Sequence, residues 1–344
     1  SAKVLILDEP TSSLTLRETT QLFEVMDKLR SDGIAIVFIT HFLDQVYEVS
    51  DRVTILRNGE LVGTYDTPTL PRLELVSLML GRSLAALDDM AKHKMDTREH
   101  IKAEAFLQAK GLGLSGSIDP FDLELHKGEV VGLAGLLGSG RTELARLIFG
   151  LDRPDAGSLD VDGTEVSDFS PTASIQRGIG LAPEDRAAEG IIADLSVRDN
   201  IILAVQANRG WLRYIRAGEA EEIADRFIEL LSIATPSADQ PVKHLSGGNQ
   251  QKVILARWLA TDPQLLILAA PPPGIDVGTN ADLQELLLDL AEKGKSCVFI
   301  SSELDEVLRT SHRIVVLRDR GKAAEITGEI DEKELMTAIA GVET

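Results

Sequence analysis

The chain has 344 residues, which is long for one average domain and indicates about two. Its 35 Lys and Arg are outnumbered by 55 Asp and Glu, and the formal net charge of −20 argues against a nucleic-acid binder and against attachment to an anionic membrane by charge alone. The single cysteine, Cys297, excludes a disulfide framework and a cysteine-rich zinc site, and no apolar run is long enough to span a membrane.

Residues 1–66 read as strands that alternate with helices. The apolar run that opens the segment 4–10 and ends in Asp8 and Glu9 predicts a strand, and the amphipathic pattern over 17–31 predicts a helix. A second strand is expected over 34–39, followed by a short helix and a strand over 52–57. This alternation predicts a mostly parallel sheet.

Three polar residues follow these strands. Asp8 and Glu9 close the first strand, and His41 comes directly after the second. Asp8 is suited to hold Mg²⁺ and Glu9 to take a proton from an attacking water. The structural alternatives are an acidic pair that faces solvent and a histidine that only packs.

The next segment, 67–104, is interpreted as a helix after Pro71 followed by a polar linker, because its second half lacks a clear periodicity. Residues 105–344 then form one complete domain, with a helical part at about 190–260. Residues 1–66 would be the back half of an earlier domain. No Met opens the chain, and its first residues lead straight into a strand, so we expect an upstream part.

A glycine-rich loop follows a buried strand predicted over 128–135. The loop GLLGSGRT runs from Gly135 to Thr142 and opens a helical stretch. It matches the pattern GxxxxGK[ST] except that Arg141 replaces Lys. Glycines let backbone N–H groups surround phosphate oxygens, and a helix N-terminus adds its dipole. Thr142 would offer its hydroxyl to Mg²⁺, whereas the alternative is a glycine-rich turn without a ligand.

Two further helices are expected in this domain. The acidic run over 217–231 predicts a solvated amphipathic helix. The string LSGGNQQK, from Leu245 to Lys252, predicts a helix capped by Ser246 whose start is open to an anion. A plain cap without a ligand is the alternative.

The end of the chain repeats its beginning at a constant separation of 261 positions, as from Val4 to Leu265. The second copy predicts a helix over 280–293 and strands over 296–301 and 313–318. The matching segments are VLILDEP (4–10) with LLILAAP (265–271), FITHFLDQV (38–46) with FISSELDEV (299–307), and SDRVTILR (50–57) with SHRIVVLR (311–318).

Together these motifs resemble a duplicated ATP-binding-cassette (ABC) ATPase of bacterial sugar importers, over essentially the whole chain. LSGGNQQK resembles the cassette signature, DEPTSSLT at 8–15 the Walker B motif and D-loop, and GLLGSGRT the phosphate loop of a second cassette. PEDR at 183–186 resembles the segment that replaces the Q-loop there. The stretch THFLDQVYEVSDRVTILRNGE is most similar to ATPases of galactofuranose-type importers.

The resemblance implies a P-loop NTPase of the ABC type. Its mostly parallel sheet would carry an antiparallel β subdomain and a helical subdomain, in two cassettes of which the first is incomplete. It also implies ATP and Mg²⁺, two transmembrane permease subunits, and through them a periplasmic or extracellular sugar-binding protein. The chain would lie peripherally at the cytoplasmic face of the membrane.

The same resemblance assigns residues to two sites. Asp8, Glu9 and His41 would act in the first, with Ser246, Gly247, Gly248 and Gln250 of the signature placed across the cassette interface. The second site would use Gly135, Gly138, Ser139, Gly140, Arg141, Thr142 and Glu184, with Thr142 at the metal.

The internal repeat predicts that the second site is degenerate. Asp8 corresponds to Ala269, Glu9 to Ala270 and His41 to Ser302, so the carboxylates and the histidine are lost. Loss of general acid–base help costs about 10²–10⁴-fold in rate. We therefore expect a site that binds nucleotide and hardly hydrolyses it.

Three functions compete on this evidence. The first is the energy-coupling ATPase of a monosaccharide importer, with galactofuranose as the candidate sugar, and this chain alone would have little or no activity. The second is a non-hydrolytic nucleotide-binding or interaction module, because neither site is complete. The third, a soluble cassette ATPase acting on DNA or ribosomes, is disfavoured by the charge of −20.

Overall fold

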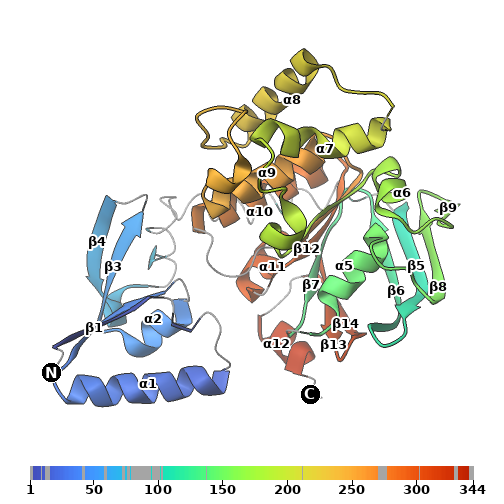
Figure 1. Ribbon diagram of the computed structural model, residues 1–344. Helices are drawn as coiled ribbons and strands as arrows, with labels where there is room; N and C mark the ends of the chain where they lie inside the picture. The colour runs from blue at the N-terminus through green and yellow to red at the C-terminus, as the bar shows by residue number, and fades with distance from the viewer. Residues whose placement is uncertain are drawn as a thin grey trace. The chain divides into compact units, whose positions relative to one another are not determined.

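The computed structural model divides into two compact units, Ser1–Asp88 and Asp89–Thr344, and we describe each by itself (Figure 1). The boundary falls inside the segment expected to link the two cassettes. The structure describes residues 3–8, 10–11, 16–40, 43–57, 60–71, 74–75, 78, 94, 101, 104–136, 138–210, 212–269, 277–301, 303–328 and 332–340.

A six-stranded sheet forms the centre of the second unit. Its order is β10-β11-β12-β7-β13-β14, and only the β13–β14 pair is antiparallel. Every residue of the first four strands in this order is buried, as expected for parallel strands covered on both faces. The strands are β7 (Val130–Ala134), β10 (Ile179–Ala182), β11 (Leu265–Ala269), β12 (Ser296–Ile300), β13 (Arg313–Arg318) and β14 (Gly321–Thr327).

A second sheet of this unit is antiparallel and has the order β6-β5-β8-β9. Along β6 (Ile118–His126) buried and more exposed residues largely alternate, because one face of the sheet packs on the core. The other strands are β5 (Ala105–Leu114), β8 (Ala156–Val161) and β9 (Thr164–Glu165). This sheet is the antiparallel β subdomain that the family resemblance implied.

Helices accompany the central sheet and also form a group of their own. Those near the sheet are α5 (Arg141–Phe149), α6 (Pro171–Gln176), α10 (Val277–Glu292), α11 (Leu304–Thr310) and α12 (Glu332–Ala340). The helical group contains α7 (Val197–Arg209), α8 (Ala217–Leu230), α9 (Gly247–Leu259) and the short η3 (Val242–His244), around a separate apolar cluster. A π-helical turn, η2 (Arg186–Gly190), packs against α9.

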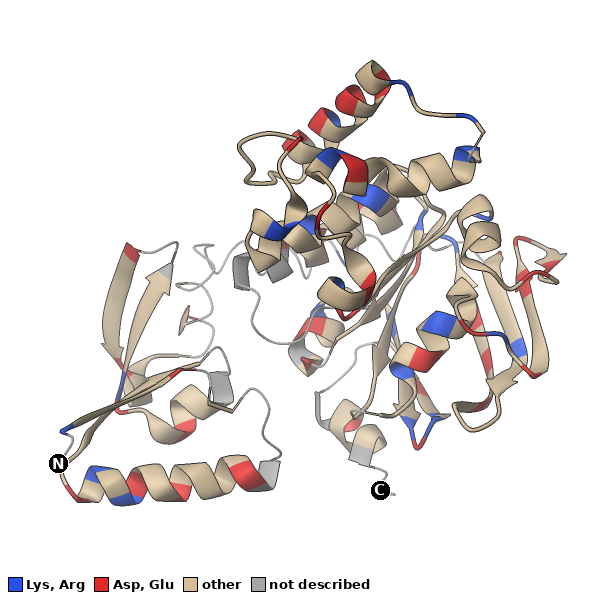
Figure 2. Cartoon of the chain, viewed as in Figure 1, with Lys and Arg blue, Asp and Glu red and all other residues tan. Residues whose placement is uncertain are grey.

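The acidic helix is amphipathic, as the sequence predicts. Along α8 the buried residues are Ala220, Ala224 and Phe227, which share one face at helical spacing. Figure 2 shows acidic residues along the rest of this helix. No helix in the described part of the chain is both long and apolar enough to cross a membrane.

The first unit contains two small sheets. Strands β1 (Val4–Asp8) and β2 (Ala35–Ile39) pair in parallel, and β3 (Arg52–Arg57) and β4 (Glu60–Asp66) form a hairpin. The helical elements are α1 (Leu16–Ser31), α2 (Leu43–Val49) and the turn η1 (Thr67–Thr69). The ring of Phe23 on α1 meets that of Phe38 on β2 edge-on, with centroids 6.0 Å apart. This contact attaches α1 to one face of the small sheet.

The internal repeat extends to the secondary structure of the described residues. Elements β1, α1, β2, α2, β3 and β4 recur as β11, α10, β12, α11, β13 and β14, with both ends of each shifted by 261 positions. The bulge between Ile55 and Leu56 recurs between Val316 and Leu317. The sequence predicted neither β4 nor β14, because their mixed composition lacks a clear alternation.

Burial differs sharply between the two copies. Ile6 is 65% exposed, whereas Ile267, at the same repeat position, is fully buried. Val37 is 47% exposed, and its counterpart Val298 is fully buried. In the second unit β10 and β7 flank the pair β11–β12, whereas β1 and β2 form a two-stranded sheet in the described part of the first unit. One sheet face of the first unit therefore presents apolar side chains to solvent.

Candidate functional site

The glycine-rich loop lies between the end of β7 and the start of α5. Gly135, Gly138 and Gly140 have φ values of 156°, 77° and 106°, which L side chains rarely adopt. A Cβ at Gly135 would also lie 2.3 Å from the carbonyl oxygen of Leu317. The amide of Arg320 donates to the carbonyl of Ser139 at 3.1 Å, which attaches the loop to the turn after β13. The loop conformation thus depends on glycine at these positions.

The loop has unsatisfied polar groups that suit an anion. Helix α5 begins after Gly140 with no side-chain cap, so its first N–H groups and its dipole are available. Ser139 is only 5% exposed, and its hydroxyl has no hydrogen-bond partner among the described residues. A buried hydroxyl without a partner is costly, and a phosphate oxygen would supply one. These residues fit a nucleotide phosphate.

Arg141 does not project freely from the loop. Its Nη1 donates to the backbone carbonyl of Ser301, just beyond β12, at 2.8 Å. Burial lowers the pKa of this guanidinium, although the nearby carboxylates of Glu184 and Glu143 act in the opposite direction. The side chain that replaces the expected lysine is therefore occupied by a protein acceptor.

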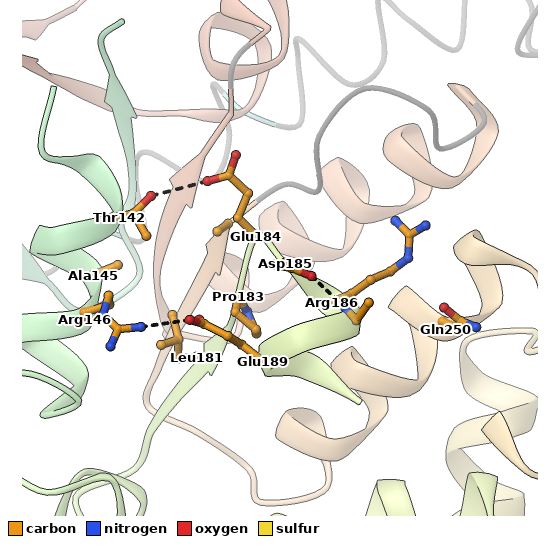
Figure 3. A pocket seen from close by; sticks show the side chains of 12 residues that line it. Thr142, Ala145, Arg146, Leu181, Pro183, Glu184, Asp185, Arg186, Glu189 and Gln250 are labelled. Carbon is orange, nitrogen blue, oxygen red and sulfur yellow. Dashed lines mark hydrogen bonds and ion pairs between the residues drawn. The ribbon is translucent and has the colours of Figure 1, made fainter. Parts of the chain in front are cut away.

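Thr142 and Glu184, both expected in the second site, lie within hydrogen-bond distance of each other. The Thr142 hydroxyl donates to Oε2 of Glu184 at 3.3 Å, on the rim of a pocket of about 490 Å³ (Figure 3). Ala269, the last residue of β11, lines the same pocket and is 4% exposed. A hydroxyl and a carboxylate are oxygen ligands of the kind that Mg²⁺ prefers. At the end of β11 the pocket is therefore lined by the methyl group of Ala269.

The signature string begins helix α9, but its cap differs from the prediction. Ser246 occupies the N-cap position, yet its hydroxyl accepts no backbone N–H and lies 2.8 Å from Nδ2 of Asn249 instead. The hydroxyl thus accepts from the side-chain amide of Asn249. Gln250 donates to the carbonyl of Leu245 at 3.1 Å, and Gly247 and Gly248 open the helix. The start of α9 remains available to an anion.

Arg186, from the segment PEDR, lies beside the signature, a contact that sequence reasoning missed. A Cβ at Gly247 would lie 2.7 Å from Nη2 of Arg186, so glycine makes room for this guanidinium. On the other side of the pocket, Arg146 of α5 pairs with Glu189 of η2 at 3.0 Å (Figure 3). Through Glu189 and Arg186, η2 thus contacts both α5, which follows the phosphate loop, and α9, which begins with the signature. Only the fold brings these distant segments together.

In the first unit the structure describes one of the three expected site residues, the proposed metal ligand Asp8. Asp8 is the exposed last residue of β1, and its register partner is Ile39 of β2. Glu9 and His41 lie outside the described residues, as do Ala270 and Ser302 of the second copy. Within the described part of the chain, no group of three His, Cys, Asp or Glu side chains is placed to hold a metal ion.

The comparisons with known proteins agree with this geometry. The family model described as ABC transporter matches residues 118–271, which include the phosphate loop, the signature and β11. The dimeric structure of a bacterial ABC transporter cassette superposes with a TM-score of 0.58 at 24% identity, covering 64% of this chain and 98% of that one. This likeness confirms the ABC-type α/β fold.

Two curated relatives match nearly all of this chain. The fructose import ATP-binding protein FruK of Bifidobacterium longum is 50% identical over 329 residues, covering 96% of this chain and 64% of that protein. The galactofuranose transporter ATP-binding protein YtfR of Escherichia coli K12 is 51% identical over 341 residues, covering 99% of this chain and 67% of that protein. The chain thus spans about two thirds of these relatives.

Proposed function

Because the chain belongs to the ABC transporter family of ATP-binding proteins, we propose that it is part of the energy-coupling subunit of a sugar importer. The observation that carries the proposal is the phosphate loop before α5, whose helix start has no side-chain cap and whose buried Ser139 hydroxyl has no partner among the described residues. Such a loop suits the phosphates of ATP. The relatives named for sugar import supply the transported class.

The partners and location of the parent protein are part of this proposal. We infer that the protein lies peripherally at the cytoplasmic face of the membrane, where it contacts two transmembrane permease subunits and, through them, serves a periplasmic or extracellular sugar-binding protein. The proposed sugar is a monosaccharide, with galactofuranose as the candidate. Relatives named for galactofuranose and fructose are almost equally similar to this chain, at 51% and 50% identity, so overall similarity does not choose between them.

We propose distinct roles for the two sites. In the first, Asp8 would bind Mg²⁺ while Glu9 and His41 act in hydrolysis. In the second, Ala269 replaces the strand-end carboxylate, which leaves Thr142 and Glu184 as the oxygen ligands near the loop. A bound magnesium ion would offset phosphate charge there. The second site would bind ATP with little turnover.

The alternative, a non-hydrolytic nucleotide-binding module, is favoured by one observation. Ala269 is the residue at the strand end that lines the second unit's pocket, and its counterpart in the first unit is Asp8. If the parent protein also lacked turnover, this second function would apply to the whole molecule.

Ser139→Ala tests the proposed phosphate site. The hydroxyl has no partner in the described structure, so its removal should leave thermal stability unchanged or slightly higher. If the hydroxyl binds phosphate, the same change should weaken ATP binding roughly tenfold in calorimetry with Mg²⁺. Undiminished ATP affinity in the variant, or no binding by the parent chain, would contradict the assignment.

Ser170→Ala is the matched control for this experiment. The Ser170 hydroxyl accepts from the amide of Ala173 at 3.3 Å and caps α6, away from the loop. Its removal should lower stability by about 1 kcal/mol without altering ATP affinity. Phosphate release measured on the same samples should stay near background, and clear turnover by this chain would contradict the degenerate second site.

A further inference from the structure

We propose that Arg141 is a clamp that holds the phosphate loop against the end of β12, and that it is not itself a phosphate contact. This role deepens the proposed nucleotide site. Of the two tests below, only the comparison of nucleotide affinities rests on that proposed function. The clamp consists of the bond between Nη1 of Arg141 and the carbonyl of Ser301, at 2.8 Å.

The topology makes this bond a connection between two separate parts of the site. Arg141 is the first residue of α5, directly after the loop. Strand β12 lies beside β7, and Ile300 is in register with Leu133, so Ser301 follows the strand next to the one that leads into the loop. The Arg141 guanidinium therefore connects the loop that follows β7 to the residue that follows β12.

The acceptor at Ser301 is itself held firmly. Ser301 is 3% exposed, and its hydroxyl donates to Oε2 of Glu306 at 2.6 Å. The amide of Glu303 donates to the same hydroxyl at 3.1 Å. These bonds tie the Ser301 side chain to Glu303 and Glu306 at the start of α11. The residue whose carbonyl Arg141 meets is therefore buried and bonded to the neighbouring helix.

The repeat shows that this arrangement is a recurring feature. Thr40, the counterpart of Ser301, donates its hydroxyl to Oε1 of Gln45, the counterpart of Glu306, at 3.5 Å. Both copies thus use a hydroxyl after the strand to bind a side-chain oxygen of the following helix. In the second unit Arg141 adds a bond to the backbone of Ser301.

The choice of acceptor argues for positioning. The bond of the Arg141 guanidinium goes to a neutral carbonyl, that of the buried Ser301, while the carboxylates of Glu184 and Glu143 act on it through charge. Phosphate binding would then fall to the backbone N–H groups at the start of α5 and to Ser139. An arginine suits a clamp better than lysine because its planar group donates in fixed directions.

The first test is hydrogen exchange of the nucleotide-free chain. Arg141→Met removes the donor with little change in length, so the loop should open more often. The amides of Ser139 and Leu144, which donate to the carbonyls of Leu136 and Gly140, should exchange at least about tenfold faster. Unchanged exchange at these amides would overturn the clamp, whether or not the chain binds ATP.

Arg177→Met is the matched control. Arg177 also donates through Nη1 to a backbone carbonyl, that of Asp168 at 3.1 Å, but it lies after α6. Its removal should leave the exchange of Ser139 and Leu144 unaltered. If Arg141→Met does not fold, the shorter polar variant Arg141→Gln replaces it, with the same expected direction.

The second test compares the affinities of the wild-type chain and the Arg141→Met variant for ATP and ADP. A clamp supports the whole loop, so Arg141→Met should weaken ATP and ADP by the same factor. A residue that contacts the terminal phosphates would instead lose ATP affinity selectively. A tenfold or larger fall in the ATP-to-ADP preference would overturn the proposal. Failure of the wild-type chain to bind any nucleotide would reject the proposed function, while the exchange result would still decide the clamp.

Discussion

Two isoleucines at the same repeat position provide a matched test of how the environment sets stability. Ile6 in β1 and Ile267 in β11 occupy equivalent places in parallel strand pairs with equivalent register. Ile6 is 65% exposed and Ile267 is fully buried. Substituting each with Ala makes the same chemical change in two different surroundings.

The expected loss of unfolding free energy differs severalfold between the two variants. Removing the outer carbons of a buried isoleucine loses about 0.8 kcal/mol for each buried CH₂ and leaves a cavity, so Ile267→Ala should lower the unfolding free energy by about 2–5 kcal/mol. Only about a third of Ile6 is covered, and solvent fills the vacated space. Ile6→Ala should therefore cost less than about 1 kcal/mol.

Native-state hydrogen exchange measures each effect where it arises. Amides of the β1–β2 ladder report on Ile6→Ala, and amides of the β11–β12 ladder report on Ile267→Ala. Each ladder is the control for the variant in the other. If Ile6→Ala destabilised its own ladder as much as Ile267→Ala does, the outward face of β1 would be covered in solution, and the reasoning from exposure would be refuted.

Three further predictions follow from single groups in the second unit. Glu129→Ala removes both oxygens that meet the buried Arg313 guanidinium, at 2.7 and 2.8 Å, and should cost about 3 kcal/mol in urea unfolding; a loss below about 1 kcal/mol would contradict it. Gly135→Ala should abolish ATP binding in calorimetry, because its Cβ would meet the Leu317 carbonyl, and retained affinity would show that the loop adapts. Burial raises the pKa of Cys297 to about 12, so the folded thiol keeps its proton where an unfolded one loses it. The unfolding free energy should then fall from about pH 9 towards pH 12, by up to about 1.4 kcal/mol per pH unit, and a Cys297→Ala variant should lose this slope.

The sequence alone predicted the parts of the site whose chemistry is local. The glycines from Gly135 to Gly140 are required by backbone conformations of the loop itself, and the pattern GxxxxG carries that requirement. The separation of 261 positions predicted equivalent elements, and six pairs of elements share it at both ends. The amphipathic spacing along α8 likewise predicted its buried face.

Contacts across the fold could not be predicted in this way. Ser246 occupies the predicted N-cap position, but its hydroxyl accepts from the Asn249 side chain and not from a backbone N–H. The bond from Arg141 to Ser301 joins residues 160 positions apart, and Arg186 reaches Gly247 only because η2 packs on α9. Sequence spacing carries no information on such pairs.

The repeat separates the two kinds of information most clearly. Ile6 and Ile267 have the same identity, the same strand position and equivalent pairing partners, and the sequence predicted both strands. Their burial differs because β10 and β7 flank one pair, while the other pair is a two-stranded sheet among the described residues. Local propensity and periodicity form the strand, but the elements packed around it decide whether its side chains leave water.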